Sequence, residues 1–168
     1  MKTIKNVLLA LFVLSCINAP GQNYKTGIGV RLGGLTTGLT FRTFVNSNSA
    51  IEGIAGFGNK NFVLTGLYEK FKPVSNAAGL QWFYGGGAHI GFFSYGSSYW
   101  YYKNKGTHIY VEEPGHSSSV FGIDFILGMD YKFNNAPLNI GLDLKPFVDF
   151  IYGTQGYFDG ALSFRFVF

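Results

Sequence analysis

The sequence predicts an all-β fold: a closed antiparallel transmembrane β-barrel, most simply of eight strands, behind a cleaved signal peptide. Three observations lead to this prediction. Runs of about ten residues alternate apolar side chains with small or polar ones, as in a strand with one lipid-facing side. After residue 22 no stretch reaches the ~20 apolar residues of a spanning helix. Charged residues are only 13% of the chain and aromatic residues 18%, unlike an average soluble domain.

Residues 1–21 have the features of a secretory signal peptide, which leaves residues 22–168 as a single barrel domain. A basic start precedes the apolar stretch 7–14, and small residues at 19–21 suit a cleavage site. Cys16, the only cysteine, lies inside this leader. Whether Cys16 is a lipidation site stays open.

The first half of the mature chain predicts four strands. We expect them at residues 24–33, 36–45, 50–58 and 61–71. The first two alternate cleanly and carry Arg31 and Arg42 on their polar faces. The third is rich in glycine and has Glu52 on its polar face, whereas the facing of the fourth is ambiguous.

The second half gives a stronger alternation. We expect its strands at residues 79–93, 120–133, 138–152 and 157–168. Pro146 interrupts the seventh strand, because proline cannot donate to a ladder, and it predicts a β-bulge. In the last strand Phe164, Phe166 and Phe168 share one face. This aromatic terminus resembles the C-terminal assembly signal of outer-membrane barrels.

Alternation alone does not decide which face points outward. A secreted lipocalin-like barrel would place the apolar face inside. Here the polar face consists mostly of glycine and isolated charges, which suits a crowded lumen better than a hydrated surface. The connections 46–49, 72–78 and 134–137 are short, as expected of periplasmic turns, and residues 94–119 form one long extracellular loop.

Three segments, 128–139, 141–147 and 160–166, resemble the small outer-membrane β-barrel proteins widespread in Bacteroidota. In size and strand number the chain is similar to the OmpA and OmpX class of eight-stranded barrels. The resemblance implies the outer membrane of a Gram-negative bacterium as location, with outer-membrane lipid around the wall and the barrel assembly machinery as a transient partner. It implies no activity.

Charged side chains recur on the predicted lumen face. They are Arg31, Arg42, Glu52, Asp124, Asp130, Lys132, Asp143, Lys145, Asp149 and Arg165, together with Asp159. An eight-stranded barrel is just wide enough to be filled by side chains, and unpaired charges are costly to bury. We therefore expect ion pairs that plug the lumen; a narrow ion or proton pathway is the alternative.

Catalytic and metal sites have weak support. Asp124 and Asp130, six residues apart on one strand, are about 20 Å apart, too far for a shared acid–base site. His89 is a candidate base of a lipid-modifying barrel enzyme, but a hydrogen-bonded lumen histidine is the simpler interpretation. His108 and His116, with Glu112 and Glu113, match no metal-binding spacing. We expect no catalytic residue, cofactor or metal.

The long loop carries a cluster of aromatic residues. Its candidate partner-binding residues are Tyr99, Trp100, Tyr101, Tyr102 and Tyr110. Exposed aromatic clusters often mark recognition surfaces, although an interfacial girdle would have the same composition. The segment reads as a hairpin, and if it joins the wall the barrel has ten strands.

The resulting hypothesis is a non-enzymatic outer-membrane barrel that acts as a structural or interaction protein, or as an accessory subunit of a membrane complex with another outer-membrane protein. The alternatives are a small passive channel and a lipid-modifying enzyme. Removing the two lysines of the leader lowers the formal net charge from +4 to +2, which gives little support for nucleic-acid binding.

Overall fold

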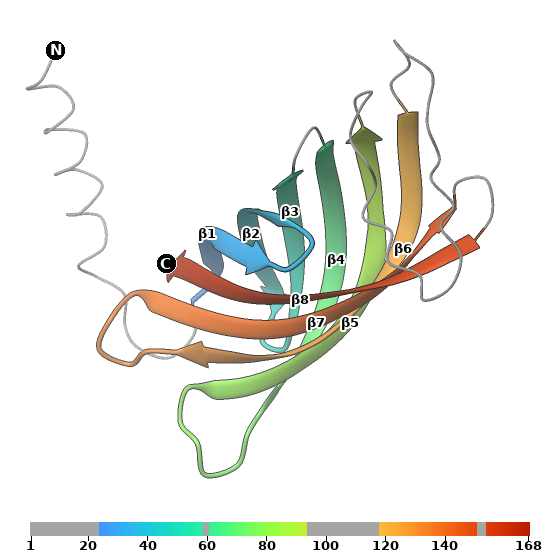
Figure 1. Cartoon of the computed structure of the whole chain (residues 1–168). Helices are drawn as coiled ribbons and strands as arrows, with labels where there is room; N and C mark the ends of the chain where they lie inside the picture. The colour runs from blue at the N-terminus through green and yellow to red at the C-terminus, as the bar shows by residue number, and fades with distance from the viewer. Residues whose placement is uncertain (1–23, 59–60, 94–117, 151–153) are drawn as a thin grey trace, which may run out of the picture.

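The structure is a computed structural model that describes residues 24–58, 61–93, 118–150 and 154–168 (Figure 1). Within these ranges the fold is all-β, and no helix is long and apolar enough to cross a membrane. The expected signal peptide and Cys16 lie outside the described residues and stay predictions.

Eight strands make up the fold. They are β1 (Thr26–Gly33), β2 (Thr37–Asn46), β3 (Ser49–Gly58), β4 (Asn61–Pro73), β5 (Leu80–Phe93), β6 (Ser118–Lys132), β7 (Leu138–Phe150) and β8 (Thr154–Val167). All eight predicted strands are confirmed, with ends that differ by up to three residues.

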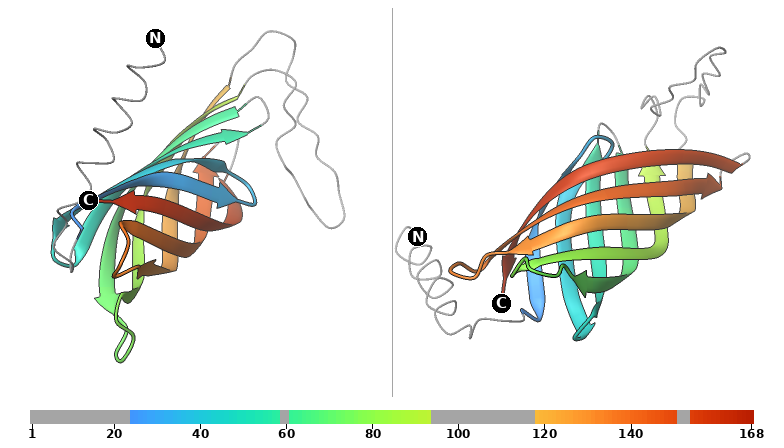
Figure 2. Two further views of the ribbon diagram at one scale, coloured as in Figure 1. Left: turned by 90° about the vertical axis from the view of Figure 1, so that its left-hand side faces the viewer. Right: turned by 90° about the horizontal axis from the view of Figure 1, so that it is seen from below.

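The strands form a closed antiparallel barrel in chain order (Figure 2). The barrel closes where β1 pairs with β8, from Gly27 opposite Val167 to Gly33 opposite Ala161. β5 pairs with β6 along its whole length, so no hairpin from the intervening loop lies between them. The ten-stranded alternative is therefore wrong.

The bulge predicted at Pro146 is also wrong. Leu144 lies opposite Leu127 and Phe147 opposite Asp124, so the register of β7 on β6 is the same on both sides of the proline. Only Lys145 and Pro146 have no partner on β6 in this ladder, while Pro146 remains opposite Phe158 of β8. The sheet thus accommodates the absent N–H by omitting ladder bonds rather than by inserting a residue.

The two ends of the barrel differ. Tyr24, Phe168 and the short turns 47–48, 74–79 and 133–137 lie at one end, here called the terminal end. In the turn between β4 and β5, Asn76 and Gly79 have φ of 65° and 84°, the left-handed region that asparagine and glycine tolerate best. The other end, called the loop end, is where β5 stops and β6 starts.

The barrel is apolar outside and polar inside. Large hydrophobic side chains point outward and are well exposed, for example Phe121 at 63% and Leu142 at 60%. All seven aspartate and glutamate residues in the described ranges are buried. A water-soluble barrel has the reverse arrangement, because charges are normally left at the hydrated surface.

Inward-facing glycines provide room for bulky lumen side chains. Gly122 lies opposite His89 and Gly128 opposite Phe83 across the β5–β6 ladder. A Cβ at Gly128 would lie 2.5 Å from the Phe83 ring, and one at Gly122 would lie 2.5 Å from the His89 ring. These glycines therefore allow the imidazole and the phenyl ring to fill the lumen.

Candidate functional site

The largest group of lumen charges surrounds Arg42 of β2. Its guanidinium contacts Glu52 of β3 at 2.6 Å, Glu69 of β4 at 2.9 Å and Asp130 of β6 at 2.9 Å. All four side chains are buried. β2 and β6 do not pair in the sheet, so the Arg42–Asp130 contact crosses the lumen.

Arg165 of β8 completes this group, which we call the Arg42 cluster (Arg42, Glu52, Glu69, Asp130 and Arg165). Arg165 contacts Glu52 at 2.6 Å and Asp130 at 3.6 Å. The second carboxylate oxygen of Asp130 accepts hydrogen bonds from the Asn139 amide, at 2.6 Å, and from the Tyr24 hydroxyl, at 3.3 Å. Glu52 and Asp130 thus each bond several donors, as burial of charge requires, whereas Arg42 is the one cation that contacts Glu69 within the described residues.

Aromatic rings cover the Arg42 cluster. The Arg42 guanidinium lies 5.0 Å from the centroid of Phe71 and 4.9 Å from that of Phe83. Phe44 packs on Phe71 at 4.9 Å, and Tyr24 packs edge-on against Phe44 at 5.2 Å. Cation–π contact adds to the ion pairs in holding the guanidinium in place.

A second group, the Arg31 cluster, joins β1, β7 and β8. Arg31 contacts Asp143 at 2.6 Å and Asp159 at 2.8 Å. Asp159 also accepts hydrogen bonds from the Thr36 hydroxyl and the Leu35 backbone N–H, at 3.0 and 2.9 Å. The same carboxylate therefore fixes both Arg31 and the β1–β2 turn.

The third group, the His89 cluster, lies toward the loop end. His89 Nδ1 is 2.7 Å from Asp124 and its Nε2 is 2.9 Å from Asp149. Lys145 contacts Asp124 at 2.5 Å and lies 4.5 Å from the Phe147 ring centroid. Both ring nitrogens face carboxylates, so neither is directed toward a space where a substrate could sit.

Most of the lumen residues identified from the sequence thus come together in three clusters. Lys132 is the exception: it is half-buried at the terminal end, and no ion pair within the described ranges includes it. Sequence reasoning missed Glu69, which is fully buried against Arg42. It also missed Tyr24 and Asn139, the hydrogen-bond donors to Asp130.

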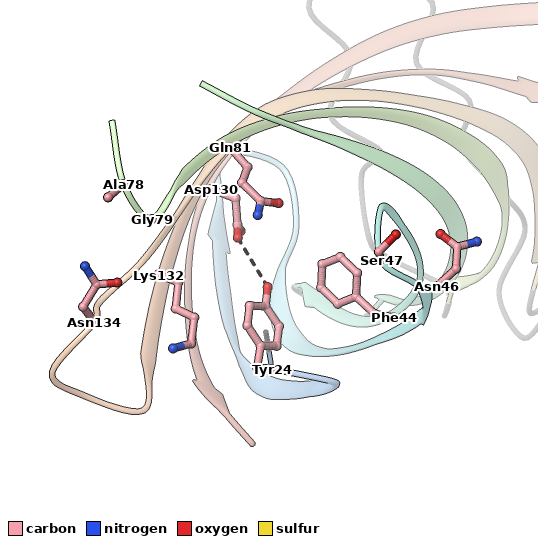
Figure 3. Close-up of a pocket in the computed structure, with 10 residues that line it drawn as sticks. All are labelled: Tyr24, Phe44, Asn46, Ser47, Ala78, Gly79, Gln81, Asp130, Lys132 and Asn134. Carbon is pink, nitrogen blue, oxygen red and sulfur yellow. Dashed lines mark hydrogen bonds between the residues drawn. The ribbon is translucent and has the colours of Figure 1, made fainter. Parts of the chain in front are cut away.

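A cavity opens at the terminal end (Figure 3), with a volume of about 380 Å³. Its lining includes Tyr24, Phe44, Gln81, Asp130 and Lys132. Tyr24 and Asp130 meet across it through the hydrogen bond drawn in Figure 3. Burial, reinforced by the Asp130 carboxylate, raises the pKa of the Tyr24 phenol, so the hydroxyl remains a donor at neutral pH.

The aromatic residues of the last strand mostly face outward. Phe164 and Phe168 are 41% and 56% exposed, and the Phe166 ring lies 6.2 Å from that of Phe168. Phe168 donates its N–H to the Thr26 carbonyl, and its carbonyl accepts from the Thr26 N–H, both at 2.9 Å. The proposed assembly signal therefore also belongs to the seam that closes the barrel.

Two predicted sites lie outside the described residues: the aromatic loop residues (Tyr99, Trp100, Tyr101, Tyr102 and Tyr110) and the weak metal candidate at 108–116. Within the described ranges no group of three or more histidine, cysteine, aspartate or glutamate side chains is placed to hold a metal ion.

No protein-family model, curated protein or solved structure matches the chain.

Proposed function

We propose that this chain is an outer-membrane β-barrel with a plugged lumen, acting as a non-enzymatic structural or interaction protein. The observation that carries this proposal is the inverted distribution of side chains. An outward wall of exposed phenylalanine and leucine surrounds an interior that holds all seven described carboxylates. Such a wall is stable in hydrocarbon, because a closed barrel satisfies every strand hydrogen bond internally.

The three clusters support a plug rather than a conduit. Arg42 to Asp130 and Arg165 to Glu52 join distant strands of the wall across the interior, and Arg31 to Asp143 joins β1 to β7 past β8. Breaking such buried pairs is costly, so the interior is better suited to rigidity than to transport. His89, with both nitrogens against carboxylates, gives no support to lipid-modifying catalysis.

In this proposal the terminal end faces the periplasm and the loop end faces the exterior. The long connection between β5 and β6, residues 94–117, is at the loop end and supports that orientation. The long connection between β5 and β6 would then present Tyr99 to Tyr102 to an outer partner, such as another protein of the same membrane. The chain would act as an accessory subunit of that complex.

The test is to extract the tagged native protein from outer membranes in mild detergent and to measure the mass of the intact particle. We expect a stoichiometric companion protein in addition to one barrel. Replacing Tyr99, Trp100, Tyr101 and Tyr102 by serine should release the companion but leave a folded barrel, recognised by its heat-dependent migration on gels. Ser97→Ala with Ser98→Ala, in the same loop, is the matched control. A particle of one barrel alone would contradict the subunit role.

A further inference from the structure

Within the described ranges, the ionised side chains on the outer surface are all of one sign. All described carboxylates and all three described arginines are buried in the lumen. What remains outside, within the described ranges, is lysine: Lys25, Lys70 and Lys72 are exposed, whereas Lys132 is half-buried and lines the cavity. The three exposed lysines are close to the terminal end. Lysines without neighbouring acidic side chains, as in this described part of the surface, attract anions.

Two of these lysines form a pair on the outer wall. Lys70 and Lys72 are two residues apart on β4 and so point to the same side, about 7 Å apart. Their neighbours on β5 are Tyr84 and Trp82. Lys72 Nζ lies 5.3 Å from the Trp82 ring centroid, and the Trp82 and Tyr84 rings stack at 5.4 Å. Lysine beside tryptophan and tyrosine is typical of the level of lipid headgroups.

Beyond the lysine pair, the outer wall is apolar and has a depression in its surface. Further along β4 the outward positions are Tyr68 and Gly66, and Gly66 lies between Gly53 of β3 and Ala88 of β5 in direct register. A Cβ at Gly53 or Gly66 would have no atom within 4 Å, so this row is a depression in the outer surface. Gly66 is about 13 Å from Lys70 along the strand, within the length of an acyl chain.

We propose that this surface binds an anionic glycerophospholipid. The lipid phosphate contacts the ammonium groups of Lys70 and Lys72, and an acyl chain lies over the row formed by Gly53, Gly66 and Ala88. The inference rests on the proposed function, because it requires the outer wall to face a bilayer. Charge complementarity selects the ligand: the surface combines two lysines that contact no carboxylate within the described residues with an apolar wall, and an anionic amphiphile matches both.

Trp82 provides the measurement, because it lies beside Lys72. With Trp100→Phe, Trp82 is the only tryptophan in the chain. The protein is inserted into phosphatidylcholine vesicles that contain either brominated phosphatidylglycerol or brominated phosphatidylcholine, and bromine quenching of Trp82 reports which lipid is adjacent. We expect phosphatidylglycerol to be preferred on the order of tenfold, since each basic group near a surface contributes about fivefold. The preference should fall with salt.

Variants separate the two parts of the surface. Lys70→Gln with Lys72→Gln should remove the preference for phosphatidylglycerol. Gly66→Leu places a side chain in the depression, where its Cβ would have no atom within 4 Å, and should reduce the preference several-fold. The matched controls are Lys25→Gln, an exposed lysine at the same end, and Gly156→Leu, an outward glycine of β8 with equally open surroundings. Both controls should keep the full preference.

The outcomes distinguish this inference from the proposed function. Equal quenching by the two brominated lipids in the protein with Trp100→Phe alone would show that it inserts without selecting a headgroup, and would overturn the inference alone. Loss of the preference in the Lys25→Gln control would also overturn it, because a diffuse charge effect would then suffice. Absence of quenching by either lipid would mean that the wall does not face a bilayer, and would overturn the proposed function as well.

Discussion

Arg42 is the residue on which most of the lumen depends. Three carboxylates from three strands contact its guanidinium, and two phenylalanine rings cover it. A buried ion pair adds little net stability compared with an apolar pair, but removal of one partner leaves uncompensated charge. Arg42 therefore stabilises the barrel mainly by compensating the buried charges of Glu52, Glu69 and Asp130.

Replacing Arg42 by methionine should destabilise the barrel by about 3–5 kcal/mol. Glu52 would keep Arg165 as a partner, but no other cation in the described ranges contacts Glu69. Urea unfolding of the protein in lipid vesicles measures the loss. Lys25→Met removes an exposed cation and should change stability by less than about 0.5 kcal/mol. Equal midpoints for the two variants would contradict the role assigned to Arg42.

Gly122 is a second sensitive position. An added Cβ would lie 2.3 Å from the Val148 carbonyl oxygen and 2.5 Å from the His89 ring. Gly122→Ala should thus cost about 1–3 kcal/mol, as overpacking does, in the same unfolding assay. Gly156→Ala, where the added methyl meets open space, is the control. A Gly122→Ala protein as stable as this control would contradict the close packing of Gly122 against His89 and Val148.

At the scale of the element, β8 joins two roles. Phe168, directly after the last residue of β8, closes the barrel through backbone bonds to Thr26, while its aromatic side chain points outward. Substitution can separate these roles, because Phe168→Ser keeps the backbone bonds and removes only the ring.

Phe168→Ser should lower the amount of folded protein in the outer membrane several-fold, because the assembly signal is altered. Refolding of the purified variant into detergent micelles, which needs no assembly machinery, should be nearly normal. Phe158→Ser, at an equally exposed position near the other end of β8, is the control for cells. Wild-type levels of the Phe168→Ser protein in the membrane fraction would refute the signal.

The strands and their facing could be predicted from the sequence because a two-residue period reports directly on which side is apolar. β4 shows where this signal fails. Its inner face combines Leu67 and Phe71 with Glu69, and its outer face carries Lys70 and Lys72. With apolar and charged residues on both sides, period alone could not assign Glu69 to the lumen.

The partners within the lumen could not be predicted either. Arg42 and Asp130 are 88 positions apart in the chain, and their contact depends on how the strands are staggered around the closed barrel. The bulge predicted at Pro146 was wrong for a related reason. The missing N–H of the proline can be accommodated by a bulge or by a gap in one ladder, and local sequence does not distinguish these.

At the scale of the whole molecule, the three clusters predict a barrel that does not conduct. The cavity at the terminal end is lined by Tyr24 and Asp130, which are hydrogen-bonded to each other, and Asp130 is bound in turn to Arg42. Purified protein in planar bilayers should give no current above that of the lipid alone. Reproducible single-channel steps from the folded protein would instead support the passive channel.

The central claim is that the apolar wall faces lipid. Phe125, 57% exposed on β6, can be replaced by cysteine in a Cys16→Ser background, which leaves a single thiol for an environment-sensitive fluorophore. In protein reconstituted into vesicles, we predict blue-shifted emission that lipid-bound quenchers reduce and aqueous iodide does not. Emission typical of water, quenched by iodide, would place Phe125 in solvent and contradict the account of this chain as a membrane barrel.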